Sequence, residues 1–147
     1  MRRPSRLALR TVQGLHLVTA FTMLLAGVAR ADPCDAPLPS MLGAHFSGTV
    51  VYVGDGDSIC VGRSGDPRSW VEVRLADFDA PEMSTPDGKR AKAMVAQLLK
   101  GKMVACAVVR GRSGRTRSHD RVLAICNLNG VPLGEYLRRQ RVPRGGR

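Results

Sequence analysis

The stretch FSGTVVYVGDGDSICVGRSGDPRSWVEVRLA, residues 46–76, decides the fold. It holds three short segments rich in β-branched and apolar residues, separated by turn-forming Gly, Asp and Pro. In the third segment, Val71, Val73 and Leu75 alternate with larger or charged side chains. The pattern predicts consecutive strands over 46–53, 58–62 and 70–76, the third antiparallel to the second.

Downstream of this stretch, the pattern changes to that of a helix. Thr85 is a candidate N-cap before Pro86, and apolar residues recur at helical spacing as far as Leu99. Two more strands are expected over 103–109 and 122–127, and a short helix over 132–140. This order predicts a mainly β, α+β fold: a five-stranded OB-type β-barrel with a helix between strands three and four and a short C-terminal helix.

The N-terminus has the pattern of a secretory signal. Basic residues precede an apolar run, and Ala29-Arg30-Ala31 forms an A-x-A cleavage site. A transmembrane anchor is the alternative, but the apolar run is short and contains polar residues. We expect a secreted or periplasmic protein with no stable membrane association after cleavage. The expected organisation is a signal peptide (1–31), an extended lead-in (32–44), the barrel domain (45–141) and a flexible tail (142–147).

The composition points to a polyanionic partner. The 147 residues include 23 Lys and Arg against 12 Asp and Glu, a net charge of +11, and only 4% are aromatic. A strong positive charge favours nucleic acid or acidic surfaces. Few aromatics argue against binding that depends on base stacking.

Four cysteines remain after the expected cleavage: Cys34, Cys60, Cys106 and Cys126. An even number in an exported chain predicts two disulfides, with three possible pairings. Buried free thiols are the alternative. Zinc is disfavoured because no two cysteines form a C-x-x-C pair.

Acidic residues gather near the ends of two predicted strands. Such carboxylates could bind a hard divalent cation such as calcium, although Asp-Gly pairs alone are ordinary turn formers. The group consists of Asp55, Asp57, Asp77, Asp79 and Glu82.

Arginines accompany this acidic group. Arg74 lies within a predicted strand, where its guanidinium could bind phosphate through two hydrogen bonds or pair with Glu72 or an aspartate. Arg121 opens the fifth strand, after the basic loop RGRSGRTRSHD at 110–120. The loop arginines attract phosphate without regard to sequence, or are simply solvated.

Three motifs in order resemble the staphylococcal nuclease (thermonuclease) family. They are GDGDS at 54–58, VRLADFDAPE at 73–82 and DRVLA at 120–124. The family pattern is D-G-D-[ST], then R-L-x-x-[VF]-D-x-P-E, then an Arg at the start of the fifth strand. The resemblance covers about residues 46–141.

The resemblance implies a calcium-dependent phosphodiesterase on an OB barrel that leaves 3′-phosphorylated products. It assigns Asp57, Asp79 and the backbone carbonyl of Ala80 as calcium ligands, with Asp55 as an acidic neighbour behind them. It also makes Glu82 the general base that activates water and assigns Arg74 and Arg121 as phosphate-binding arginines.

One segment departs from the family pattern. The family usually has D-[KR]-Y-G-R before the fifth strand, and here Ser118-His119-Asp120-Arg121 replaces its last four residues. We expect His119, in place of a phosphate-contacting tyrosine, to bind substrate together with Arg117. An exposed histidine without a role is the alternative. Asp120 puts a negative charge beside Arg121 and could pair with a loop arginine or weaken phosphate binding.

The OB topology also suggests the disulfide pairing. If strands four and five pair, Cys106 and Cys126 could bridge them, and Cys34 and Cys60 would then tie the lead-in to strand two.

Two functions follow from these observations. The first is an exported, calcium-dependent nuclease, monomeric and acting on single-stranded DNA and RNA with little sequence preference. The second is a non-catalytic OB-fold protein that binds nucleic acid or another partner. A protein that only binds has no need of Glu82, which favours the enzyme.

Overall fold

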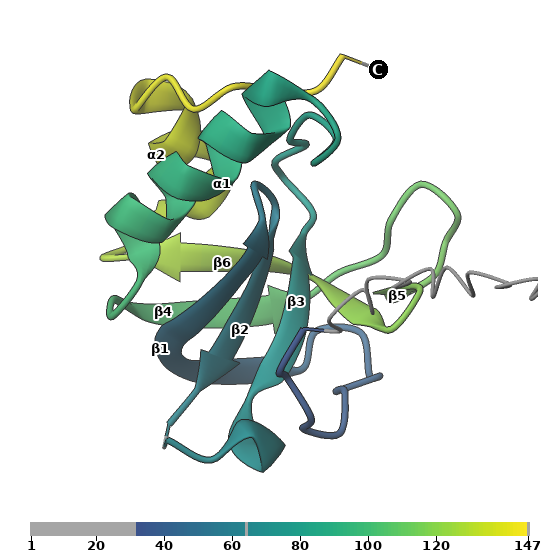
Figure 1. Cartoon of the computed structure of the whole chain (residues 1–147). Helices are drawn as coiled ribbons and strands as arrows, with labels where there is room; N and C mark the ends of the chain where they lie inside the picture. The colour runs from purple at the N-terminus through teal and green to yellow at the C-terminus, as the bar shows by residue number, and fades with distance from the viewer. Residues whose placement is uncertain (1–31, 64, 147) are drawn as a thin grey trace, which may run out of the picture. The chain divides into compact units, whose positions relative to one another are not determined.

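The computed structural model describes residues 32–63 and 65–146 (Figure 1). The expected signal peptide lies outside the described residues. No helix in the described part of the chain is long and apolar enough to cross a membrane.

Five strands form the wall of a closed, mixed β-barrel. They are β1 (His45–Asp55), β2 (Ser58–Gly62), β3 (Val71–Leu75), β4 (Met103–Val108) and β6 (Arg121–Leu128). Neighbouring strands follow the order β3-β2-β1-β4-β6, and the parallel pairing of β3 with β6 closes the barrel. All other pairings are antiparallel. This is the OB-type α+β fold that the sequence predicts.

Two short strands complete the wall, and neither they nor the 3-10 form of the turn predicted over 63–69 was expected. The two-residue strands β5 (Arg117–Ser118) and β7 (Val131–Pro132) both pair with β6, and a 3-10 turn spans Pro67–Ser69. The rest of the strand prediction is confirmed with small differences in the ends. β1, for example, runs two residues beyond the expected Val53 and ends at Asp55.

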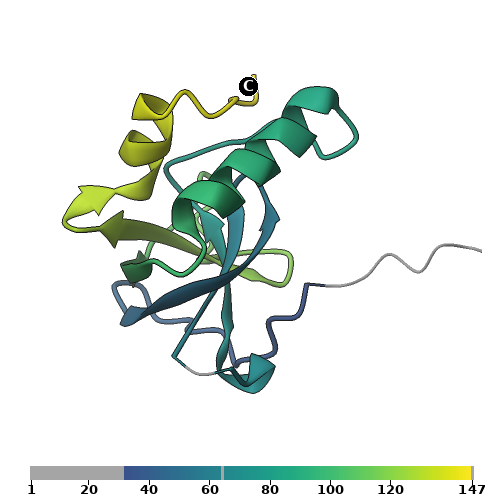
Figure 2. The same cartoon turned by 60° about the vertical axis from the view of Figure 1, so that its left-hand side comes forward.

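Two helices lie beside each other over one end of the barrel (Figures 1 and 2). In α1 (Pro86–Leu99), the Thr85 hydroxyl accepts a hydrogen bond from the Gly88 N–H at 3.0 Å, as the N-cap prediction requires. Its inner face buries Ala91, Val95 and Leu99 against the barrel core. The shorter α2 (Leu133–Arg139) adds Leu133 and Leu137 to the same core, both without exposed surface.

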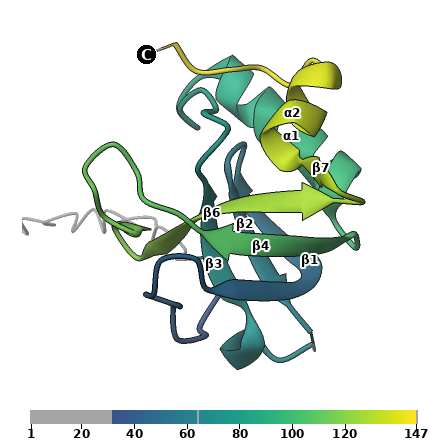
Figure 3. The same ribbon diagram turned by 180° about the vertical axis from the view of Figure 1, so that it is seen from behind.

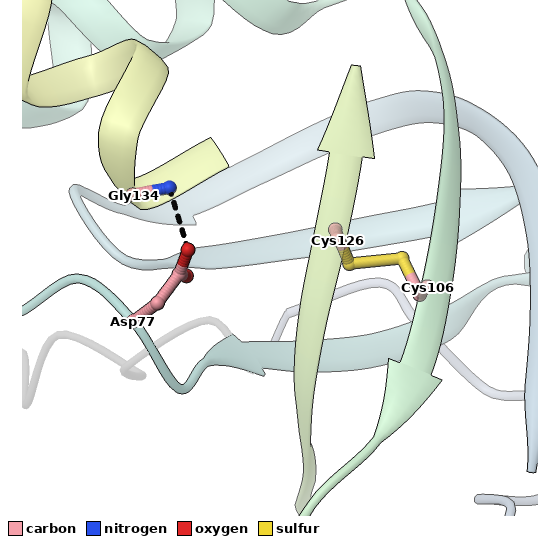
Figure 4. Close-up of a disulfide and its surroundings, with 4 residues drawn as sticks. All are labelled: Asp77, Cys106, Cys126 and Gly134. Atoms are coloured by element: carbon pink, nitrogen blue, oxygen red, sulfur yellow. Dashed lines mark hydrogen bonds between the residues drawn. A yellow bond between two sulfur atoms is a disulfide. The ribbon is translucent and has the colours of Figure 1, made fainter. Parts of the chain in front are cut away.

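Two disulfides fasten the barrel, with the expected pairing. Cys106 and Cys126 stand opposite each other on β4 and β6 with 4.0 Å between their Cα atoms (Figure 4). Cys34 and Cys60 join the lead-in to β2, with 5.7 Å between Cα atoms. The described residues contain no free cysteine.

The lead-in and the tail both pack on the barrel domain. The Asp35 and Ala36 N–H groups donate to the carbonyls of Pro67 and Trp70, at 3.0 and 3.1 Å. At the other end, we expected a flexible tail over 142–147. Instead Val142, which is 3% exposed, belongs to the hydrophobic core, so the packed structure extends beyond α2.

Candidate functional site

A cleft of about 1020 Å³ opens at the helix-covered end of the barrel. Four chain segments supply its walls: the β1–β2 turn, the stretch from β3 into α1, the β5–β6 turn and the C-terminal segment. The structure thus brings most of the predicted site residues together. Those that line the cleft are Asp55, Asp57, Arg74, Asp79, Ala80, Glu82, His119 and Arg121.

Asp57 is the buried acid of the cleft. Its Oδ2 accepts a 2.6 Å hydrogen bond from the Ala80 N–H, and its own N–H donates to Asp55 Oδ1 at 2.9 Å. Burial raises the pKa of Asp57 to about 7, and the Asp55 carboxylate adds to the rise. The Ala80 N–H and the Arg74 guanidinium lower the pKa but do not outweigh burial. Because burial disfavours the charged form of this carboxylate, a nearby cation would strongly stabilise its negative charge.

Arg74 connects Asp57 to Asp79. Its Nε lies 3.1 Å from Asp57 Oδ1, and one Nη donates to Asp79 Oδ1 at 2.5 Å. The other Nη donates to the carbonyls of Leu75 and Phe78, at 2.5 and 2.8 Å. The ion pair expected as an alternative therefore exists, with two aspartates and not with Glu72. Because the side chain is only 15% exposed, these bonds fix the guanidinium at the cleft wall.

Arg121 supplies a second guanidinium from the neighbouring strand β6. It opens β6, and its Nη lies 3.5 Å from Asp55 Oδ2, a long ion pair with both side chains partly exposed. The parallel β3–β6 pairing brings its strand beside that of Arg74. Two cations far apart in sequence therefore lie on the walls of one cleft.

Glu82 is exposed and follows the loop that holds Asp79 and Ala80. Its backbone carbonyl accepts hydrogen bonds from the Thr85 N–H and hydroxyl, at 2.9 and 2.8 Å, which ties it to the start of α1. Among the described residues, no hydrogen bond or ion pair engages its carboxylate. Glu82 is thus anchored by its backbone while its side chain is left for other partners.

The two expected substrate-binding residues end up in different places. His119 lines the cleft from the turn between β5 and β6, with a φ of 57° that favours glycine. Arg117 is not part of the cleft wall, because one of its Nη atoms donates to the Leu38 carbonyl of the lead-in at 3.1 Å. The structure therefore brings His119 to the site but not Arg117.

Asp77, one of the acidic group, has a structural contact instead of a place in the cleft. Its Oδ2 accepts a 2.9 Å hydrogen bond from the Gly134 N–H at the start of α2 (Figure 4). Arg138 of the same helix donates to the Asp77 backbone carbonyl at 2.7 Å. Asp77 thus caps α2 and joins that helix to the loop after β3.

The cleft residues suit a hard divalent cation. Asp57, Asp79 and the Ala80 carbonyl offer oxygen donors only, as calcium prefers, and the buried Asp57 carboxylate favours a cationic neighbour. Over 32–63 and 65–146, no group of three or more His, Cys, Asp or Glu side chains is arranged to hold a metal ion. The predicted set, with two carboxylates and a carbonyl, is smaller than such a group.

Sequence reasoning missed the fourth wall of the cleft. Arg144, Gly145 and Gly146 line it, and the Gly145 N–H donates to the Asp79 carbonyl at 2.9 Å. The Gly-rich composition of this segment favoured a flexible tail. The available signal was the apolar residue Val142, shortly after the predicted helix, because such a residue often packs into the core. In the structure Val142 is buried.

Comparison with known proteins bears on what this cleft belongs to. No family model matches the chain. The chain is similar to micrococcal nuclease of Shigella flexneri, with 46% identity over 55 residues. That match covers 37% of this chain and 30% of the relative. With the barrel, the match supports placing the chain in a staphylococcal/micrococcal nuclease-like family.

Proposed function

We propose that this protein is an exported, calcium-dependent nuclease that hydrolyses phosphodiester bonds of single-stranded DNA and RNA. The observation that carries the proposal is one cleft whose walls hold the acids Asp57, Asp79 and Glu82 and the guanidinium groups of Arg74 and Arg121. Phosphodiester hydrolysis needs a positioned water, a proton acceptor and positive charge around phosphorus. The partial similarity to a nuclease supports the same activity.

In this proposal, Asp57, Asp79 and the Ala80 carbonyl would hold calcium, with Asp55 behind them. Bound calcium would supply positive charge to the phosphate and orient water. Asp57 and Asp79 now hold the Arg74 guanidinium through ion pairs. If these carboxylates bound a cation instead, Arg74 would lose two acceptors and would be available to phosphate oxygens.

The remaining chemistry belongs to side chains of the cleft. Glu82 accepts the proton of the attacking water, because its carboxylate lines the cleft and is exposed. Arg74 and Arg121 donate hydrogen bonds to the phosphate oxygens and offset the negative charge that develops during attack. His119 adds a donor at the edge of the cleft.

The proposed substrate range follows from the chemistry of the cleft. Its walls offer cations for the backbone phosphates and, among the described residues, no Phe, Tyr or Trp side chain on which a base could stack. We therefore propose cleavage with little sequence preference. By the same proposal, the N-terminal signal directs the protein to the periplasm or the medium, where it acts as a monomer.

A digestion assay with purified protein tests the function. Wild-type protein should degrade single-stranded DNA with calcium and lose activity in EDTA. Glu82→Gln and Arg121→Ala should each lower kcat by about 10²–10⁴-fold, because the first removes the proton acceptor and the second a phosphate contact. The control is Glu135→Gln, a partly exposed acid of α2 outside the cleft, which should keep full activity.

The same assay decides between the enzyme and the binding protein. Binding of oligonucleotides without calcium-dependent turnover would refute the nuclease and support a non-catalytic OB-fold protein. Full activity in both Glu82→Gln and Arg121→Ala would refute the roles given to these residues.

A further inference from the structure

The C-terminal segment beyond α2 reaches the loop that carries the proposed calcium ligands. The chain runs from α2 across to the start of α1 (Figure 3). Val142 and Pro143 are buried, which anchors the segment to the domain. Two residues later, the Gly145 N–H donates to the Asp79 carbonyl at 2.9 Å. The segment is thus held at both of these points.

Gly145 lies against the Asp79–Ala80–Pro81 backbone with no room for a side chain. A Cβ at this position would stand 2.7 Å from the Ala80 carbonyl oxygen and 3.1 Å from its carbon. Both atoms are backbone and cannot swing aside as a flexible side chain would. The backbone of Gly145 has no positive φ, so the constraint is space and not conformation.

The next residue provides a contrast. A Cβ added to Gly146 would meet nothing within 4 Å, and Gly146 also has no positive φ. Two adjacent glycines line the same cleft, but only Gly145 packs against Ala80 and donates a hydrogen bond to the Asp79 carbonyl. Of these two positions, only 145 lacks the space for a side chain.

We propose that Gly145 is a positioning residue that fixes the Ala80 carbonyl for the cation. Its N–H holds the Asp79 carbonyl, and its missing side chain lets the Ala80 carbonyl keep its place. This inference rests on the proposed function, because the Ala80 carbonyl is one of the proposed ligands. It adds a residue about 65 positions further along the chain to the control of that site.

The test compares Gly145→Ala with Gly146→Ala. Calorimetric titration with calcium chloride alone should show a dissociation constant about 10–100-fold weaker for Gly145→Ala, the usual effect of disturbing the support of a metal ligand. Gly146→Ala should bind calcium as the wild type does. Saturating calcium should restore the kcat of Gly145→Ala, because the catalytic side chains are unchanged.

Thermal unfolding in EDTA separates positioning from general stability. Both variants should unfold within a few degrees of the wild type, because position 145 lies outside the hydrophobic core. A large loss of stability for Gly145→Ala alone would show a role in the fold and overturn the proposal. Calcium binding by Gly145→Ala within about twofold of wild type would also overturn it. If the wild type itself binds no calcium, the proposed function fails first, and the inference falls with it.

Discussion

At the scale of single residues, Glu72 carries an electrostatic cost. It lies on β3 with 9% of its surface exposed, near the carboxylates of Asp32 and Asp120. Burial and these two neighbours raise the pKa of Glu72 from its ordinary 4.5 to about 7, although Arg121 lowers it. The folded protein therefore favours protonated Glu72, and the stability gained in this way is lost as the pH rises through 7.

We expect Glu72→Gln to be more stable than the wild type at about pH 8, with a Tm higher by at least about 4 °C. Glutamine resembles the protonated side chain, so the two proteins should have nearly equal Tm values near pH 4.5. Calorimetric scans at both pH values measure the difference. The control Glu135→Gln, at a partly exposed position, removes an ion pair with Arg139 and should therefore show no gain in stability at high pH. A wild type more stable than Glu72→Gln at pH 8 would contradict this account.

The cleft residues that lie in local motifs could be predicted individually, and others could not. Asp57, Arg74 and Glu82 belong to contiguous motifs that resemble those of the nuclease family, and the resemblance predicts that they lie at one site. Glu72, by contrast, lines a pocket together with residues 32–38 of the lead-in and Asp120, which are distant from it in sequence. Asp77 is another example. Its carboxylate suggests a metal ligand, but it caps α2, and nothing in the sequence around Asp77 indicates that contact.

At the scale of elements, the strands and helices were predictable because their patterns are local. Alternation, turn residues and the Thr85 cap lie within the segments that they define. The parallel pairing of β3 with β6 is different, because it joins segments separated by a helix and two strands. It was implied by the OB topology and not by any one segment. The two-residue strands β5 and β7 are too short to have a pattern.

The bridge between β4 and β6 should contribute strongly to stability. Cys106 and Cys126 are buried and directly opposite each other, and they close a loop of about 20 residues. We expect the double variant Cys106→Ala/Cys126→Ala to lose roughly 3 kcal/mol of unfolding free energy in urea titration. Ala105→Ser, an exposed neighbour on β4, should lose little. A double variant as stable as the wild type would show that strand pairing alone holds these elements.

At the scale of the whole molecule, the chain is strongly basic, but its cleft contains both acidic and basic side chains. The chain carries a net +11, yet the cleft gathers several of its 12 acidic residues beside arginines. Arg74 and Arg121 both pair with aspartates there. Arg144 lines the same cleft, and no ion pair engages it among the described residues. It is therefore the cleft arginine most available to a polyanion.

We expect Arg144→Gln to weaken binding of a single-stranded oligonucleotide and to reduce its salt dependence. Loss of one phosphate contact should lower the slope of log K against log salt concentration by about 0.7. Binding would be measured by fluorescence anisotropy in the inactive Glu82→Gln background, over a range of salt concentrations. The control Arg112→Gln, an exposed arginine outside the cleft, should change the slope less. Equal slopes for the two variants would place the substrate elsewhere.

The closure of the barrel through Val73 and Val122 has a consequence for local unfolding. Arg74 belongs to one side of this seam and Arg121 to the other, so a brief separation of β3 from β6 would move the two guanidinium groups apart. Asp55, Asp57 and Glu82 would then lose Arg121 as a neighbour. We therefore expect amide exchange along this seam to report directly on the fraction of molecules whose two arginines share one cleft.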